Sequence, residues 1–389
     1  MGTPHRNKMM LFDAFFIISI SLLFVYAFVF LWYAYGWTKL NSPTTSVSLS
    51  TSVSVVVAVR NEEKNTSKLL DCISKQDYPI GLLEIIVVDD SSTDRTVETI
   101  KEFQEKNHSV NIVLLLLENT SPNPSPKKRA IAEGIKSSKG KLIITTDGDC
   151  EMGNKWISSV VSCYEKTSGK MIVSPVSLSS TKHFFEQAQS LEFLSLIGSS
   201  GASLYFKKPL MCNGANLAYE RSVFFETGAF ENSKNRASGD DMFMMLAVDK
   251  KYPGQIVFNK SEQAIVTTAA CNRLSIFIAQ RKRWASKSLQ YKNGYIYLIS
   301  ALVYTINISI TISVVFSIFY NRFVPAFLFL FIGKSLIDFI FLIPVSSFFN
   351  KKPLLIFLLP MQLIYALYVS VAGLFAFSNN YYWKGRQLK

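Results

Sequence analysis

The fold is decided by the stretch Leu142-Ile143-Ile144-Thr145-Thr146-Asp147-Gly148-Asp149, in which a short apolar run ends at two carboxylates. The same pattern occurs earlier in Ile85-Ile86-Val87-Val88-Asp89-Asp90, and a looser version follows in Ser238-Gly239-Asp240-Asp241. Short, β-branched apolar runs of this kind are typical of buried strands. Because open α/β sheets bind their ligands at the carboxyl ends of parallel strands, we expect these acids to lie at that edge.

Strands and helices alternate around this stretch. The patterning predicts strands at residues 53–59, 83–88, 111–117 and 141–146, with helices at 65–75, 96–104 and 128–137 between them. Such an alternation indicates right-handed βαβ units and a mostly parallel sheet. Further along, we expect an amphipathic helix at 184–197 followed by a Gly/Ser-rich loop at 198–202, a turn-rich stretch at 212–216, and helices at 240–248 and 275–291.

Hydrophobic residues make up 49% of the 389-residue chain, and the excess is concentrated in four segments. These are residues 10–35, 295–320, 323–345 and 354–377, each long enough to cross a bilayer. The first is too long for a signal peptide and is not followed by a small-residue cleavage pattern. We therefore predict an N-terminal membrane anchor (1–36), an α/β domain with an interfacial helix (37–294), about three C-terminal membrane helices (295–378) and a basic tail (379–389).

The formal net charge of +13 favours anionic partners. Lys351 and Lys352, between the last two hydrophobic segments, are typical of a cytoplasmic loop. A basic domain beside a membrane attracts anionic lipids and anionic small molecules. Nucleic acid is excluded as a partner because no Lys/Arg stripe is interleaved with aromatic residues. The five cysteines include no Cys-x-x-Cys pair, which argues against a zinc or redox motif.

The acids at the strand ends suit a phosphate-bearing ligand with a divalent cation. Mg²⁺ or Mn²⁺ on a diphosphate needs one or two protein carboxylates, because water and phosphate oxygens fill the other positions. We assign Asp149 as the metal ligand, and Asp147 to the metal or to a ribose. Taken alone, an Asp-x-Asp could equally be a solvated turn.

Asp89 and Asp90 are candidates to accept hydrogen bonds from a nucleobase and a ribose, as strand-end acids do in dinucleotide folds. The alternative is an Asx turn that caps the next helix near Asp94. Asp240 and Asp241 begin a helix, where the dipole alone favours carboxylates. Asp241 is nevertheless our candidate for the base that deprotonates an acceptor hydroxyl.

A basic motif, Gln280-Arg281-Lys282-Arg283-Trp284, lies just before the second hydrophobic segment. Arg283 could hold a departing diphosphate with two hydrogen bonds, and the Trp284 indole could cover a sugar ring. The motif could instead be a cationic flank with an interfacial anchor. Within the third segment, Lys334 and Asp338 are either functional or an internal ion pair.

Taken together, these motifs resemble membrane-bound family-2 glycosyltransferases, over about residues 53–287 and in the order of that family. The matching stretches are Val55-Val56-Val57-Ala58-Val59-Arg60-Asn61-Glu62, Val87-Val88-Asp89-Asp90-Ser91-Ser92-Thr93-Asp94, Lys127-Lys128-Arg129-Ala130-Ile131, Asp147-Gly148-Asp149, Gly239-Asp240-Asp241 and the Gln-x-x-Arg-Trp motif at Gln280–Trp284.

The resemblance implies a GT-A catalytic domain, which is Rossmann-like with a mostly parallel sheet, between N- and C-terminal transmembrane helices. It implies a UDP-sugar donor, or alternatively a GDP-sugar, with Mg²⁺ or Mn²⁺ and inversion at the anomeric carbon. Val59, Asn61, Glu62 and Lys128 would join Asp89, Asp90 and Asp147 in binding the donor. Asp240 stands where the family more often has Glu, so the base lies between two neighbours.

We therefore predict an inverting glycosyltransferase that uses a lipid or lipid-linked acceptor, with Gln280, Arg283 and Trp284 in its catalytic machinery. We expect a multi-pass protein of the inner or plasma membrane with a cytoplasmic catalytic domain. The alternatives are a processive polysaccharide synthase and, from another class, a transporter or receptor with a nucleotide-binding domain. The tail Trp383-Lys384-Gly385-Arg386 resembles an element of lipid-glycosylating relatives that is often cytosolic, although three full spans would place it outside.

Overall fold

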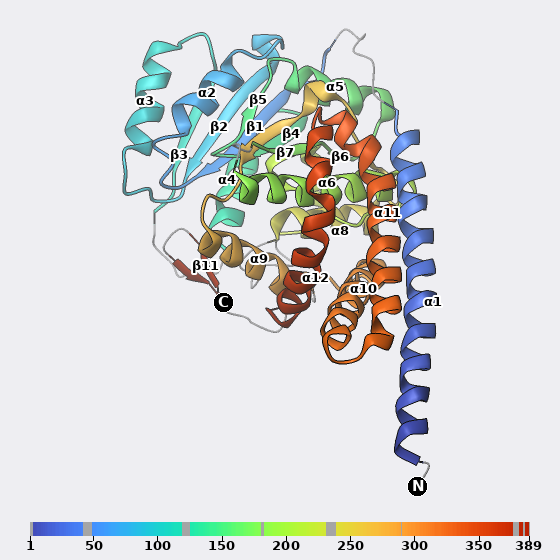
Figure 1. Cartoon of the computed structure of the whole chain (residues 1–389). Coiled ribbons are helices and arrows are strands. Elements are labelled where there is room, and N and C mark those ends of the chain that lie inside the picture. Colours follow the sequence, from blue (N-terminus) through green and yellow to red (C-terminus); the bar gives the residue numbers. More distant parts are fainter. Residues whose placement is uncertain are drawn as a thin grey trace. The chain divides into compact units, whose positions relative to one another are not determined.

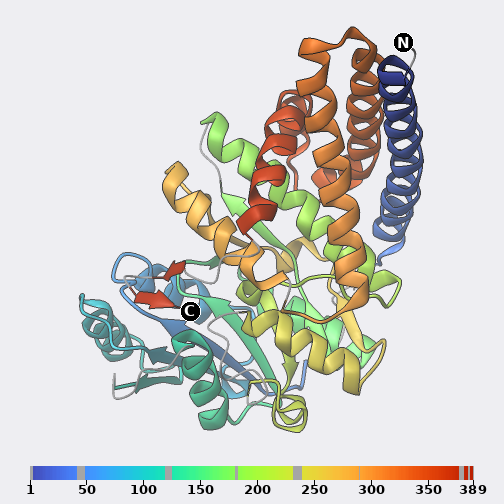
Figure 2. The same ribbon diagram turned by 90° about the horizontal axis from the view of Figure 1, so that it is seen from below.

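The structure is a computed structural model that describes residues 3–41, 49–118, 125–179, 183–230, 239–288, 290–375, 381–383 and 386–388. It divides into two compact units, each described here by itself. The sheet unit comprises Lys39–Arg273 and Asn380–Lys389, and the helical unit comprises Met1–Thr38 and Leu274–Asn379. Figures 1 and 2 show the elements of both.

A seven-stranded sheet in the order β3-β2-β1-β4-β8-β6-β9 forms the centre of the sheet unit. β3, β2, β1 and β4 are mutually parallel, whereas β8 runs antiparallel to both its neighbours and β9 runs parallel to β6. The predicted α/β class with a mostly parallel sheet is thus confirmed. The strands are β1 (Val53–Val59), β2 (Leu83–Asp89), β3 (Ile112–Leu116), β4 (Leu142–Asp147), β6 (Met171–Val173), β8 (Leu217–Glu220) and β9 (Ile256–Phe258).

The central strand β1 consists almost wholly of valine, and all its residues except Ala58 are buried. A strand that is covered on both faces has this continuous apolar composition. Its register aligns the carboxyl ends of its neighbours, because Val59 is paired with Asp89 on β2 and Ala58 with Asp147 on β4. The two acidic strand ends therefore flank the end of β1.

Helices cover both faces of this sheet (Figure 1). α4 packs directly on β1 and β2, and a methyl group at Gly134 of α4 would lie 2.5 Å from a methyl of Val56 and 3.0 Å from one of Val88. The glycine thus allows close packing of this helix. The helices are α2 (Thr66–Ser74), α3 (Thr96–Lys106), α4 (Pro126–Ser137), α5 (Trp156–Thr167), α6 (Phe184–Tyr205), α7 (Arg221–Thr227) and α8 (Asp240–Lys251).

One local prediction is wrong. The loop expected at residues 198–202 is instead part of the continuous helix α6, which extends to Tyr205. Every residue of this small-side-chain stretch is buried. Glycine and serine are poor helix formers in isolation, but close packing of the buried helix overrides that preference.

A small second sheet adjoins the main one in the order β5-β10-β7, with β5 at Glu151–Met152, β7 at Val176–Ser179 and β10 at Val266–Ala269. In the predicted basic tail, β11 (Tyr381–Trp383) and β12 (Arg386–Leu388) form an antiparallel pair. Lys384 and Gly385 of the tail motif, like Ser238 of the third acidic motif, lie outside the described residues.

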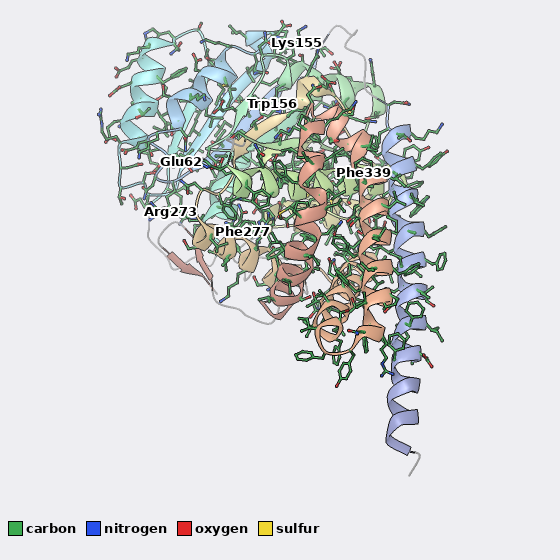
Figure 3. All side chains as sticks on the ribbon, viewed as in Figure 1. Glu62, Lys155, Trp156, Arg273, Phe277 and Phe339 are labelled. Carbon is green, nitrogen blue, oxygen red and sulfur yellow. The ribbon has the colours of Figure 1, made fainter. Side chains whose placement is uncertain are left out.

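The helical unit contains four helices that are long and apolar enough to span a membrane, as predicted. Outward side chains such as Phe339 (Figure 3) are apolar and exposed, as contact with lipid requires. Its helices are α1 (Thr3–Lys39), α9 (Leu274–Ser288), α10 (Gly294–Phe319), α11 (Val324–Phe348) and α12 (Leu358–Phe375).

A buried polar network joins three helices of this unit. The Lys334 ammonium lies 2.7 Å from Asp338 and 2.9 Å from the side-chain oxygen of Gln362 on α12. The Gln362 amide donates to Asp338, and so does the hydroxyl of Tyr26 on α1, at 2.6 Å. Of the two interpretations of Lys334 and Asp338, this geometry favours the internal ion pair, since each charge is compensated.

Candidate active site

The candidate site lies at the carboxyl end of β1, where the strand order changes direction. β2 and β3 follow on one side of β1, and β4 lies on the other. Chain connections diverge from such a switch point, which leaves room for a ligand beyond the strand ends. The predicted acids at the ends of β2 and β4 therefore border one position on the sheet.

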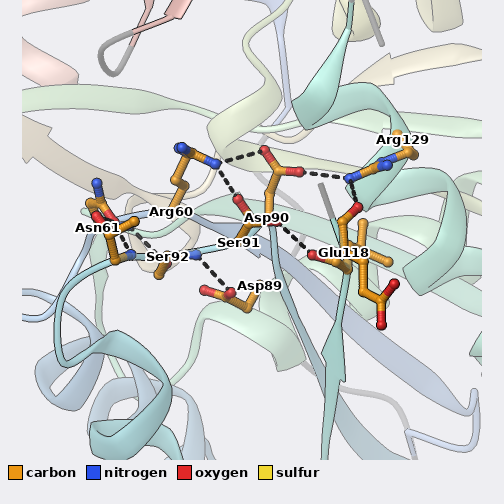
Figure 4. A network of polar contacts seen from close by, with 10 residues as sticks. Arg60, Asn61, Asp89, Asp90, Ser91, Ser92, Glu118 and Arg129 are labelled. Carbon is orange, nitrogen blue, oxygen red and sulfur yellow. Dashed lines mark hydrogen bonds and ion pairs between the residues drawn. The ribbon is translucent and has the colours of Figure 1, made fainter. Parts of the chain in front are cut away.

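The turn after β1 is fixed to the turn after β2. Asn61 adopts a left-handed conformation with φ of 52°, which asparagine tolerates better than most residues. Its main-chain N–H donates to the Ser92 hydroxyl at 2.9 Å, and its side-chain oxygen accepts from the Thr93 N–H at 2.8 Å. Figure 4 shows part of this network. The predicted donor-binding turn is thus held to the turn after β2 by two hydrogen bonds.

Asp90 is almost fully buried between two arginines (Figure 4). Arg129 of α4 lies 3.0 Å from one carboxylate oxygen, and Arg60 lies 3.7 Å from the other. Arg60 also donates to the main-chain oxygen of Asp90 at 2.5 Å, and Arg129 to that of Glu118 at 3.2 Å. Asp90 therefore connects the turn after β1, the end of β2 and α4.

The neighbouring Asp89 is buried but only half satisfied. Its Oδ2 atom accepts a hydrogen bond from the Ser92 N–H at 2.9 Å, while its Oδ1 atom has no hydrogen-bond partner among the described residues. A buried polar atom without a partner is costly, and such atoms are often explained by a ligand or a water. Asp89 Oδ1 can accept a hydrogen bond from an N–H or O–H group of a bound molecule.

The Asp-x-Asp at the end of β4 lies against the turn after β1. A side chain at Gly148 would lie 3.1 Å from Glu62 and 3.2 Å from Val59, so the two segments are close (Figure 3 labels Glu62). Asp147 Oδ1 lies 2.5 Å from the Lys127 ammonium of α4. Asp149 Oδ2 accepts a hydrogen bond from the Thr268 hydroxyl of β10 at 3.3 Å.

Asp240 and Asp241 begin α8, directly after Gly239, which has a φ of 85°. The Gly214 N–H donates to Asp241 Oδ2 at 3.1 Å, and the Met242 N–H donates to Asp241 Oδ1 at 2.8 Å. The Gly214 carbonyl in turn accepts from the Thr145 hydroxyl of β4 at 3.2 Å. Asp241 is thereby connected to the strand that ends in Asp147.

The short helix η2 (Gly214–Asn216), which carries Gly214, is anchored in the core. The fully buried Asn216 amide donates to the carbonyls of Pro175 and Ala264, both at 2.8 Å. Its side-chain oxygen accepts from the indole of Trp156, which Figure 3 labels, at 2.9 Å. This rigid support fixes the backbone donor that orients Asp241.

Three carboxylates act together on Lys127. Burial lowers the pKa of its ammonium, but Asp147, Asp240 and Asp241 outweigh that effect and raise the pKa above its ordinary value. Burial also raises the pKa of the Cys212 thiol, with Asp241 and Asp240 adding to the shift. Acids from the end of β4 and the start of α8 thus both raise the pKa of Lys127, and Asp147 also pairs with it directly.

The donor set fits a divalent cation only as part of a larger ligand. Among the described residues, no group of three or more His, Cys, Asp or Glu side chains could hold a metal ion by itself. Asp147 and Asp149 supply carboxylate oxygens, which Mg²⁺ and Mn²⁺ prefer. Phosphate oxygens would have to complete the coordination.

The other predicted residues belong to α4 and to α9. Lys128 is buried, with its ammonium 5.3 Å from the ring centre of Phe243 and 5.9 Å from that of Phe230. Gln280, Arg283 and Trp284 belong to α9 in the helical unit. There Arg281 is buried between Phe277 and Trp284, 4.7 and 4.3 Å from their ring centres (Figure 3 labels Phe277).

Two residues of the site, Lys127 and Arg129, were not among the predicted side chains, although the motif contains them. The helical periodicity of this segment could have shown which of its basic side chains leave the core. Lys128 shares the stripe of Ile131 and Ile135, which faces the core, so its two neighbours had to point elsewhere.

Comparison with known families agrees with this architecture. The family described as "Glycosyl transferase family 2" matches residues 54–227, and "Glycosyl transferase family group 2" matches residues 142–369, more than half of the chain.

Individual relatives are more distant. Poly(ribitol-phosphate) beta-N-acetylglucosaminyltransferase TarS of Staphylococcus aureus is 35% identical over 89 residues, which cover 23% of this chain and 14% of TarS. Beta-monoglucosyldiacylglycerol synthase of Nostoc sp. is 23% identical over 240 residues, 60% of this chain and 48% of the synthase. The chain therefore spans less than half of the length of either relative.

The same fold occurs in a solved structure, the mannosyltransferase PcManGT of Pyrobaculum calidifontis in complex with GDP-Man and Mn²⁺. The likeness covers 93% of this chain and 99% of PcManGT, with a TM-score of 0.57 and 18% sequence identity. The fold, the strand-end acids and the family matches lead to one conclusion: the chain belongs to the family-2 glycosyltransferases and has the GT-A fold.

Proposed function

We propose that the enzyme transfers a single sugar, with inversion, from a nucleoside diphosphate donor to a lipid or lipid-linked acceptor at a membrane. The observation that carries the proposal is that Asp147 pairs with Lys127 beside the switch point of the sheet, while Asp241 is linked through Gly214 to Thr145 of the same strand. This arrangement offers acids for a donor and for an acceptor within one site. A UDP-sugar is the first candidate donor and a GDP-sugar the second, the latter because the fold relative PcManGT is known with GDP-Man.

In this proposal the donor's nucleoside binds at the ends of β1 and β2. The unpartnered Asp89 Oδ1 atom accepts a hydrogen bond from the base or the ribose, and the turn formed by Val59, Asn61 and Glu62 lies beside it. Asp90 holds the turn after β1 and the end of β2 in place through its ion pairs with Arg60 and Arg129. Lys128, buried on its aromatic rings, would contribute by holding α4 in position.

The acceptor hydroxyl loses its proton to Asp241 as its oxygen attacks the anomeric carbon, and the bond from that carbon to the diphosphate breaks. Asp240 is the alternative base. A divalent cation, Mg²⁺ or Mn²⁺, held with Asp149 and Asp147 would neutralise the charge that develops on the leaving diphosphate. Arg283, Gln280 and Trp284 remain candidates, from the motif alone, for holding the leaving group and the acceptor.

The lipid acceptor is supported by the four apolar helices and by the relative that is named for synthesis of a glucosyldiacylglycerol. We propose a multi-pass protein of the inner or plasma membrane, with the sheet unit on the cytoplasmic side, where Lys351 and Lys352 also belong by the positive-inside rule. Protease accessibility in sealed vesicles of known orientation tests this topology.

The decisive experiment uses the full chain in membranes, a panel of labelled UDP- and GDP-sugars, and lipid extract, with and without Mn²⁺. We expect one donor to yield a labelled lipid with a single added sugar, and chelation to stop the reaction. A ladder of products would establish the processive synthase instead. Donor binding without transfer to any acceptor would contradict the enzymatic proposal and favour a nucleotide-binding transporter or receptor.

A further inference from the structure

We propose that Lys127 takes the place of a divalent cation at Asp147 while no donor is bound, so that the metal enters only together with the nucleoside diphosphate. This inference rests on the proposed function, since it concerns the order in which that site is filled. It makes Lys127 a positioning residue for the donor complex.

The geometry begins with the ion pair. The Lys127 ammonium lies 2.5 Å from Asp147 Oδ1, and the two side chains are only 29% and 34% exposed. An ammonium at this distance occupies the direction from which a cation would approach that oxygen. Lysine suits this role because its ammonium is a compact point charge on a flexible stem, which can move when another anion arrives.

The surrounding charges make Lys127 the counterion of the whole site. Asp147 pairs with it directly, and Asp241 at the start of α8 is joined through Gly214 to Thr145 on the strand that carries Asp147. Asp240 and Asp241 also raise the pKa of Lys127. Without the ammonium, the carboxylates would repel one another, and their combined field would attract any dication. The protein therefore lowers its affinity for a free metal ion with its own cation.

The donor removes this obstacle. No group of three or more ligating side chains among the described residues could hold a metal by itself, so a cation gains its remaining anionic ligands from the diphosphate, with water in the other positions. The diphosphate also offers Lys127 a second anion in place of Asp147. Metal and diphosphate should consequently bind with strong positive coupling, and neither should bind well alone.

The test compares Lys127→Gln with Lys127→Arg and with Lys136→Gln. Lys136 is on the same helix and pairs with Glu133 at 2.8 Å, but that pair is exposed, so its loss controls for removal of one positive charge from α4. Mn²⁺ binding to the nucleotide-free full chain in detergent is measured by isothermal titration calorimetry, and binding of UDP and GDP is measured in EDTA.

We expect Lys127→Gln to bind Mn²⁺ about tenfold more tightly than wild type, and to bind metal-free nucleoside diphosphate about tenfold more weakly. Lys127→Arg and Lys136→Gln should resemble wild type in both titrations. Opposite changes for the two ligands cannot come from a merely loosened site, which would weaken both. Adding Asp147→Asn to Lys127→Gln should return the Mn²⁺ affinity toward the wild-type value.

Unchanged or weaker Mn²⁺ binding by Lys127→Gln, with wild type still binding nucleoside diphosphate and Mn²⁺ together, would overturn this role of Lys127 alone. If wild type binds no nucleoside diphosphate even with Mn²⁺, the proposed function itself fails. If Lys127→Gln does not fold, as judged by its thermal transition, Lys127→Arg decides. Its guanidinium keeps the charge, so tighter Mn²⁺ binding by Lys127→Arg would contradict the proposal.

Discussion

The main-chain N–H of Gly214 donates a hydrogen bond to Asp241 Oδ2 at 3.1 Å, and a side chain at position 214 would lie 3.5 Å from the Asp241 Cβ atom. The proposed base is therefore oriented by backbone that is itself anchored through Asn216. A carboxylate that accepts backbone hydrogen bonds is stabilised in its ionised form, the form that a base requires.

Asp241→Asn should abolish transfer while leaving the donor bound. The amide cannot take a proton, so we expect kcat to fall by about 10²–10⁴-fold. The donor dissociation constant, measured with Mn²⁺, should stay near the wild-type value. Asp240→Asn in the same assay decides between the neighbours, and Asp249→Asn at the other end of α8 is the control. Full turnover by Asp241→Asn would assign the base elsewhere.

Asp90→Asn should destabilise the sheet unit. The change leaves Arg60 and Arg129, which are 12% and 21% exposed, without their shared counterion. Breaking a buried pair costs about 3–5 kcal/mol, and this partial exposure reduces our expectation to about 2–3 kcal/mol. A lower thermal transition in detergent would report it.

The matched control is Asp71→Asn, which removes an exposed ion pair with Lys75 at 2.8 Å. Such a pair contributes about 0.5 kcal/mol or less, so its transition should hardly move. Equal shifts for Asp71→Asn and Asp90→Asn would show that Asp90 contributes no more to the stability of the fold than an exposed ion pair does.

Gly134→Ala should weaken the packing of α4 on the sheet. The added methyl would lie 2.5 Å from a methyl of Val56 and 3.0 Å from one of Val88, which is too close without a shift of the helix or the sheet. Overpacking costs about 1–3 kcal/mol, which exceeds the roughly 1 kcal/mol that alanine gains as a helix former. We expect a lower thermal transition and, because α4 carries Lys127 and Arg129, weaker donor binding. Gly81→Ala, with nothing within 4 Å, should leave both unchanged.

Acid should destabilise the sheet unit partly through Glu220. Burial raises the pKa of this carboxyl, but the Lys170 ammonium at 2.8 Å and the Tyr164 hydroxyl at 2.9 Å outweigh it and hold the pKa below its ordinary value. A depressed pKa in the folded state gives stability that is present above the unfolded pKa and lost as pH falls below it.

The thermal transition should therefore fall as pH decreases below about 4.5, near the unfolded pKa of Glu. Glu220→Gln should start from a lower transition at pH 7 and show a shallower decline with acid. An identical pH profile for wild type and Glu220→Gln would remove Glu220 from the explanation.

Much of the sheet could be predicted because its strands are apolar without interruption. The predicted bounds of β1 match the structure, β2 extends one residue further than predicted, and β4 is shifted by one residue at both ends. The insertion of the antiparallel β8 between β4 and β6 could not be predicted, since strand order depends on contacts between distant segments and not on local pattern.

The candidate site was predictable in its acids and less so in its cations. Carboxylates after apolar strands have a fixed position at the sheet edge, whereas the direction of three successive basic residues depends on the phase of α4. That phase buries Lys128 and turns Lys127 toward Asp147 and Arg129 toward Asp90. The loop predicted at 198–202 failed because burial of α6 outweighs the low helix propensity of its small residues.

The network of Tyr26, Lys334, Asp338 and Gln362 has a consequence for biosynthesis. Translation delivers α1 first, and the charged pair on α11 emerges only after residues 39–273 of the sheet unit have been made. In the proposed multi-pass topology, the Tyr26 hydroxyl of α1 is already available to Asp338 before α12 supplies Gln362. In that topology we expect the first helix to wait beside the site of insertion while the chain between Tyr26 and Asp338, 312 positions apart, is made.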